Sequence, residues 1–168
     1  MSSPLDALYG EQVIFHSKNP RNCRKLVTAN RIAEGHNPIC GDHQIVYLQV
    51  EDDVINDISF VPVGADKVKN CAISKASASM MTGSLKGKSR QEAEALFNEF
   101  HGMLTGKFDG ETAKNNLGNL IVFAGVRQFP ERIKCATLPW HTMRSALEGK
   151  DVTTTENLDL GHNIQDVS

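Results

Sequence analysis

Four cysteines are the residues of this sequence whose type and spacing could do chemistry: Cys23, Cys40, Cys71 and Cys135. They lie 17, 31 and 64 positions apart, and no two of them form a C-x-x-C pair. This spacing argues against zinc-ribbon and thioredoxin-type motifs. In a reducing compartment, scattered cysteines are thiols, metal ligands or nucleophiles more often than disulfides. Composition alone also allows all four to be small buried hydrophobic side chains.

Three of the cysteines occupy positions that favour a thiolate or a metal ligand. Cys40 lies in a turn with Asp42 two residues later, and residues two apart in an extended segment can point to the same side. Cys71 comes where a loop becomes a helix, and the unpaired N–H groups at the start of a helix favour a thiolate. Cys135 closely follows Arg132, and a nearby cation has the same effect.

These positions support two interpretations. Three thiolates and one carboxylate form a donor set that suits tetrahedral zinc, or iron in a cluster. That site requires three separate segments of the chain to converge, which spacing alone does not establish. The alternative is a set of buried, inert cysteines and an Asp42 that only forms a turn.

The elements that must position these residues begin with a pair of strands. Apolar residues alternate over 43–50, which predicts a strand, and a second β-rich run covers 54–63. The polar residues 51–53 connect the two runs, so we expect an antiparallel hairpin. Pro62 places the end of the second strand at a sheet edge or a bulge. Residues 23–35 follow no clear pattern.

Helices are predicted before and after the hairpin. The first follows a capping box at Ser3, with Ile14 and Phe15 on its apolar face, and ends in the polar residues 17–22. Three more helices are expected. One covers 72–85, and one runs from the capping box of Ser89 and Glu92 to Gly106. The last covers 131–147, where Pro139 should kink or loosen the helix. Strands early and helices late indicate the α+β class.

Length and charge exclude several function classes. The chain has 168 residues, which supports one domain over 1–149, followed by a polar tail over 150–168 that we expect to have little order. The net charge of −2 provides no basic face for nucleic acid. No apolar run approaches the ~20 residues that span a membrane, and the first ten residues lack signal-peptide features. We therefore expect a cytoplasmic protein that binds neither nucleic acid nor membrane.

Three motifs resemble those of the IscU/NifU-type iron–sulfur cluster assembly proteins. Residues 37–42 (NPICGD) resemble the first cysteine motif, 71–81 the second and 132–140 (RIKCATLPW) the third. They occur in the order of the family, and with their flanks they cover roughly residues 5–148. Lys134 stands where the IscU branch has a histidine, and the segment 86–106 resembles the extra residues of the SufU branch. The resemblance is therefore nearest to the SufU branch.

The resemblance implies a fold and a metal site. The fold is the SufE/NifU-like α+β fold, a small three-stranded antiparallel sheet with helices packed on one face. The third strand is then expected within residues 23–35. The site is a zinc ion held by Cys40, Asp42, Cys71 and Cys135.

The resemblance also implies a reaction and a partner. The SufU branch acts with a SufS-type cysteine desulfurase, a pyridoxal-phosphate enzyme that leaves a persulfide on its own cysteine. The desulfurase offers a histidine to the zinc and displaces the first cysteine, which by position is Cys40, so that this thiolate accepts the sulfur. Arg132 is the candidate to pair with Asp42 or with the released thiolate. The chain is then a sulfurtransferase that passes sulfur to a downstream iron–sulfur scaffold or apo-protein.

Two further functions use the same residues. A transient [2Fe–2S] cluster on Cys40, Cys71 and Cys135, passed on to apo-proteins, would make the chain a non-enzymatic scaffold. A purely structural zinc domain is the third possibility. Lys134, in place of the histidine of the scaffold branch, favours sulfur transfer.

Three features lie outside the shared pattern. Residues 61–70 form a longer approach to Cys71 than the family has, without a glycine beside the cysteine, and we expect this insertion to reshape desulfurase docking. Cys23 is expected to be a bystander thiol, with sulfur relay or a redox role as the alternative. His43 adjoins the site, where it is either a strand-edge residue or a hydrogen-bond partner of a ligand.

Overall fold

A four-stranded sheet forms the base of the molecule. The computed structural model describes residues 10–37, 42–63, 72–106, 117–149 and 152–154. The strands β1 (Arg31–Asn37), β2 (Asp42–Glu51), β3 (Val54–Pro62) and β4 (Val152–Thr154) lie in the order β3-β2-β1-β4. β1, β2 and β3 pair antiparallel, and β4 adds to β1 in parallel. The expected three-stranded antiparallel sheet is confirmed, and its third strand, β1, begins within the unpatterned segment and ends two residues beyond it.

The hairpin of β2 and β3 follows the sequence closely. Asp52 and Asp53 both have positive φ angles, 53° and 61°, as the tight turns that join twisted antiparallel strands require. Val46, Leu48, Ile58 and Phe60 alternate onto one face of the two strands and are fully buried. β3 is an edge strand, which agrees with the place predicted for Pro62.

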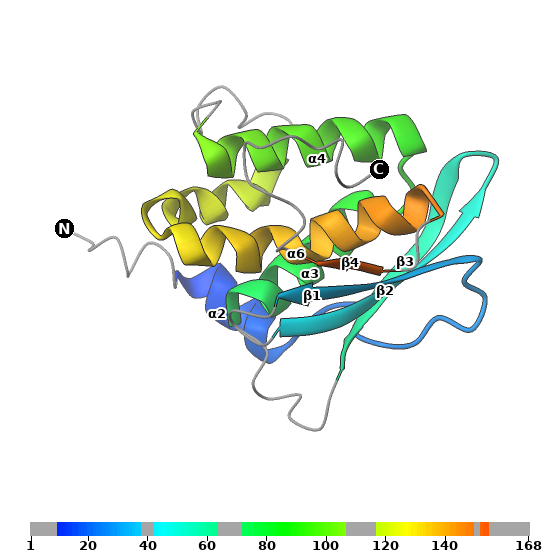
Figure 1. Ribbon diagram of the computed structural model, residues 1–168, viewed down its shortest axis with the longest axis horizontal. Helices are drawn as coiled ribbons and strands as arrows, with labels where there is room; N and C mark the ends of the chain where they lie inside the picture. The colour runs from blue at the N-terminus through cyan, green and yellow to red at the C-terminus, as the bar shows by residue number, and fades with distance from the viewer. Residues whose placement is uncertain (1–9, 38–41, 64–71, 107–116, 150–151, 155–168) are drawn as a thin grey trace.

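The helices cover one face of the sheet in two layers (Figure 1). Their bounds are α2 (Glu11–Lys18), α3 (Ala72–Leu85), α4 (Arg90–Thr105), the 3-10 helix η2 (Gly118–Gln128) and α6 (Pro130–Leu147). α3 and α6 pack on the sheet and on each other, while α4 and η2 pack outside them. Within the described part of the chain, no helix combines the length and the apolar character needed to cross a membrane.

α4 in the outer layer and α6 in the inner layer show why the sequence folds this way. α4 begins at the predicted capping box, where the Glu92 amide donates to Ser89 Oγ and the Ser89 amide to the Glu92 carboxylate. It ends at Gly106, which has a φ of 84°. α6 is buried on nearly every side from Cys135 to Met143, and Trp140 stacks on Phe100 of α4 with ring centroids 4.6 Å apart. α6 is therefore the central helix of the core, and it carries one of the motif cysteines.

Two predictions about the ends of the chain need correction. Ile14 and Phe15 of α2 are 41% and 52% exposed, and the helix buries Val13 and His16 instead, while residues 1–9 lie outside the described part. Residues 152–154, placed in the poorly ordered tail, form β4 because β1 offers an unpaired edge to them. The division into a 1–149 domain and a tail otherwise stays a prediction.

Candidate functional site

The described part of the predicted metal site is centred on Cys135, in the second turn of α6. Its side chain is fully buried, and its Sγ lies 3.8 Å from the carbonyl oxygen of Glu131. Asn37, the last residue of β1, is also fully buried, and its Nδ2 donates towards this sulfur over 3.7 Å. An amide donor at a thiol sulfur favours the thiolate form. The contact therefore joins the end of β1 to the start of α6 at a sulfur suited to metal binding.

The hairpin of β1 and β2 carries the first motif to the same place. Asn37 pairs with Asp42 in the antiparallel register, and this last residue pair directly adjoins the connecting residues 38–41. Cys40 belongs to that connection and lies outside the described residues, as does the side chain of Asp42. The end of the hairpin that leads to Cys40 is thus the end that contacts Cys135.

Buried hydrogen bonds tie the start of α3, which follows Cys71, to both neighbouring elements. Gln44 of β2 donates from Nε2 to Ser74 Oγ over 2.8 Å. Ser77, one turn later, donates to the carbonyl oxygen of Ala136 and accepts from Trp140 Nε1. Cys71 itself lies outside the described residues, but α3 begins at the next residue, as predicted. The segments next to all three motif cysteines therefore meet at one end of the molecule.

The remaining predicted residues fall in different places. Arg132 lies on α6, three residues before Cys135, and is partly buried; its pairing with Asp42 stays a prediction. Cys23 is exposed and bridges to Phe60 of β3, on the far side of β2 from Asn37. This separation agrees with the prediction that Cys23 is not part of the motif site.

Sequence patterns did not predict the buried amides of Asn37 and Gln44 at this end of the sheet, nor the contact of Glu34 with His36 and His43. Asn37 and Gln44 are fully buried, and Gln44 Oε1 has no hydrogen-bond partner among the described residues. On the opposite face of the sheet, the Glu34 carboxylate lies between the imidazoles of His36 and His43. The hydrogen bond from His43 holds the pKa of Glu34 below its ordinary value, and the neighbouring imidazole of His36 acts in the same direction. The sequence signal for β1 was an alternation of residue types over 33–37, but the buried residues of this alternation are too small or too polar to mark a strand.

The comparison with known families agrees with this geometry. The model of the NifU-like N-terminal domain family matches residues 8–136, which include all three motif cysteines. The chain belongs to this family. It is the family of the IscU and SufU iron–sulfur cluster assembly proteins, as the resemblance of the motifs predicted.

Individual relatives cover nearly the whole chain. The iron–sulfur cluster assembly scaffold protein IscU of Streptococcus pyogenes serotype M1 is 36% identical over 165 residues, which are 96% of this chain and 98% of that protein. The zinc-dependent sulfurtransferase SufU of Bacillus subtilis (strain 168) is 36% identical over 143 residues, 85% of this chain and 91% of that protein.

A solved structure supports the fold. A putative iron–sulfur cluster assembly scaffold protein for the SUF system from Fervidobacterium islandicum AW-1 superposes with a TM-score of 0.74 at 35% identity. The match covers 84% of this chain and 98% of that chain. The NifU-like α+β fold expected from the motifs is therefore confirmed.

Proposed function

We propose that this protein is a zinc-dependent sulfurtransferase of iron–sulfur cluster assembly, which accepts persulfide sulfur on Cys40 from a SufS-type cysteine desulfurase. The observation that carries the proposal is the meeting of the segments next to Cys40 and Cys71 at the buried Cys135. The SufU relative, at 36% identity, is the second support. A cytoplasmic location and transfer of the sulfur to a scaffold or apo-protein are part of the same proposal.

In this proposal a zinc ion would be held by Cys40, Asp42, Cys71 and Cys135, and of these four side chains the structure describes that of Cys135. The Nδ2 amide of Asn37 donates towards the buried Cys135 sulfur, and such a donor favours the thiolate form that zinc binds. A bound zinc ion would keep the coordinating thiols deprotonated at neutral pH. The polar contacts of Asn37 and Gln44 hold the strand ends and α3 in a fixed relation, as a ligand set drawn from three segments requires.

The proposed transfer is an ordinary thiol–disulfide-type exchange. The Cys40 thiolate attacks the outer sulfur of the persulfide on the desulfurase cysteine. The bond between that outer sulfur and the cysteine sulfur breaks, and the desulfurase cysteine leaves as a thiolate. Cys40 then carries the persulfide, and no external oxidant or reductant is needed. Arg132, three residues before Cys135 on α6, is the candidate to neutralise Asp42 or the thiolate that leaves the metal.

A scaffold for a [2Fe–2S] cluster is the second candidate function. It is favoured by the relative of Streptococcus pyogenes, which is named as a scaffold and matches 96% of this chain. The two functions use the same cysteines, so the metal content of the protein must separate them.

Metal analysis and anaerobic reconstitution test the choice between the two. Sulfur transfer predicts one zinc per chain held tightly at the cysteine site of the purified protein, and no stable coloured cluster after iron and sulfide are added. A stable cluster that the protein hands to an apo-acceptor would instead establish the scaffold function. A Cys135→Ala variant should lose the zinc, whereas Cys23→Ala, the matched control, should keep it.

A further inference from the structure

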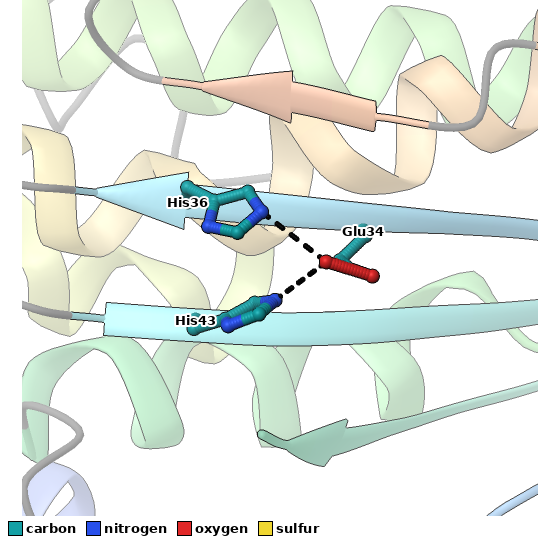
Figure 2. Close-up of side chains that lie close together, drawn as sticks. All are labelled: Glu34, His36 and His43. Carbon is teal, nitrogen blue, oxygen red and sulfur yellow. Dashed lines mark hydrogen bonds and ion pairs between the residues drawn. The ribbon is translucent and has the colours of Figure 1, made fainter. Parts of the chain in front are cut away.

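Glu34, His36 and His43 form a cluster on the face of the sheet opposite the helices. Glu34 and His36 are two residues apart on β1, and His43 pairs directly with His36 from β2. Their alternate neighbours Ala33, Gly35 and Asn37 are buried. The cluster therefore points away from the core, and Figure 2 shows both imidazoles directed at one carboxylate.

The distances in the cluster are those of a ligand set. Glu34 Oε2 lies 2.8 Å from His43 Nε2 and 3.2 Å from His36 Nε2, and the three ligand atoms lie within 4.8 Å of one another. Ligand atoms around a tetrahedral zinc ion are about 3.3 Å apart, given metal–ligand bonds of about 2.0–2.1 Å. The nitrogen and oxygen atoms therefore need only small side-chain rotations to surround an ion.

The backbone holds the three side chains in place before any ion binds. All three residues belong to paired strands, and the two imidazole rings lie 3.9 Å apart at an angle of 31°. Ligands that a rigid sheet orients lose little conformational freedom on binding, which increases affinity. The side chains are 26–38% exposed, so an ion can enter and water can complete its coordination.

We propose that Glu34, His36 and His43 bind a divalent first-row transition-metal ion, at a site separate from the one that contains Cys135. Two imidazoles and one carboxylate with open positions are a ligand set for Zn²⁺ or Fe²⁺. The site lies one residue pair before Asn37 and Asp42 in the hairpin that leads to Cys40, but on the other face of the sheet. It contains no thiol, so it does not depend on the sulfurtransferase function.

Cobalt titration distinguishes the two sites because the absorption spectrum of bound Co²⁺ depends on the ligands that hold it. The full chain is stripped of metal, given one equivalent of Zn²⁺ and then titrated with Co²⁺ at mildly alkaline pH. We expect a further equivalent to bind with visible d–d bands and without the near-ultraviolet thiolate-to-cobalt charge transfer. Each of Glu34→Gln, His36→Asn and His43→Gln should weaken this binding at least about tenfold, since even outer-shell partners of a metal contribute 10–100-fold.

Glu51→Gln is the matched control. Glu51 is an exposed carboxylate at the other end of β2, so its loss should leave cobalt binding unchanged. Wild-type protein that binds no further equivalent, or variants of the three residues that bind like wild type, would overturn the proposal. If instead the stripped chain binds a single ion without thiolate charge transfer, and the three variants lose it, the second site stands and the zinc–thiolate function fails.

Discussion

At the scale of single residues, Asn37 is a polar side chain in contact with the sulfur that we propose as a zinc ligand. It is a fully buried amide at the end of β1, and it donates towards the sulfur of Cys135. A donor that contacts a ligand atom fixes the position of that atom and stabilises its charge. The buried amide therefore links the geometry of the sheet to the basicity of the thiolate.

Replacing Asn37 by alanine should weaken zinc binding about 10–100-fold while the fold is retained. Competition with a chromophoric chelator measures the change, and circular dichroism checks the fold. Asn30→Ala is the control, because Asn30 bonds the backbone of Val50 at the opposite end of β1. Wild-type zinc affinity in Asn37→Ala would contradict the role of this amide.

His141 makes a second prediction at this scale, for the pH dependence of stability. Burial, with smaller effects of His101 and Arg144, lowers the pKa of His141 from 6.5 to about 3, and its Nε2 has no hydrogen-bond partner among the described residues. Between these two pH values the unfolded chain binds a proton that the folded chain does not. The free energy of unfolding should therefore fall as the pH is lowered below about 6.5, with His141 contributing up to about 1.4 kcal/mol per pH unit.

Denaturant unfolding at about pH 7 and about pH 5 tests this prediction. His141→Leu removes the titrating group and keeps an apolar side chain between Phe97 and His101, so stability should depend less on pH in the variant. An equal pH dependence in wild type and variant would show that another group dominates.

At the scale of elements, the close approach of β1 to α6 brings Asn37 to Cys135 and explains why the sequence pattern did not predict β1. A Cβ atom on Gly35 would overlap the hydroxyl oxygen of Thr142 and lie 3.1 Å from Leu138 Cδ1. The inner face of β1 is therefore small or polar, and lacks the apolar alternation that marked β2 and β3. Capping residues and 3.6-residue periodicity predicted α4 well, because those signals are local. α3 and α6 also begin and end within one residue of their expected bounds.

Gly35→Ala should destabilise the protein by about 1–3 kcal/mol, because the added methyl group forces β1 away from α6. Adding Thr142→Ala should restore part of the loss, which a double-mutant cycle of denaturant unfolding measures. Gly83→Ala is the control, since a Cβ there meets nothing within 4 Å on the exposed side of α3. Additive effects of the two substitutions would mean that the strand and helix do not press on each other at this point.

At the scale of the whole molecule, the order of the three motifs predicted the family, and the fold brings their flanking segments together. The motif cysteines could be identified because their neighbours are characteristic in type. Gln44 and Ser74 could not be identified, because their contact depends on how α3 packs on β2. The cluster of Glu34, His36 and His43 depends on the register of two strands, one of which had no recognisable pattern.

If Cys40 accepts sulfur from a cysteine desulfurase, as we propose, the chain must increase the turnover of that enzyme. A SufS-type desulfurase is supplied with cysteine and limiting reductant, with the zinc-loaded wild-type chain or its Cys40→Ala variant, and alanine production is followed. We expect the wild-type chain to stimulate turnover and Cys40→Ala, although folded, not to do so; mass spectrometry should then find the persulfide on Cys40. Full stimulation by Cys40→Ala, or a persulfide on another cysteine, would contradict the role proposed for Cys40.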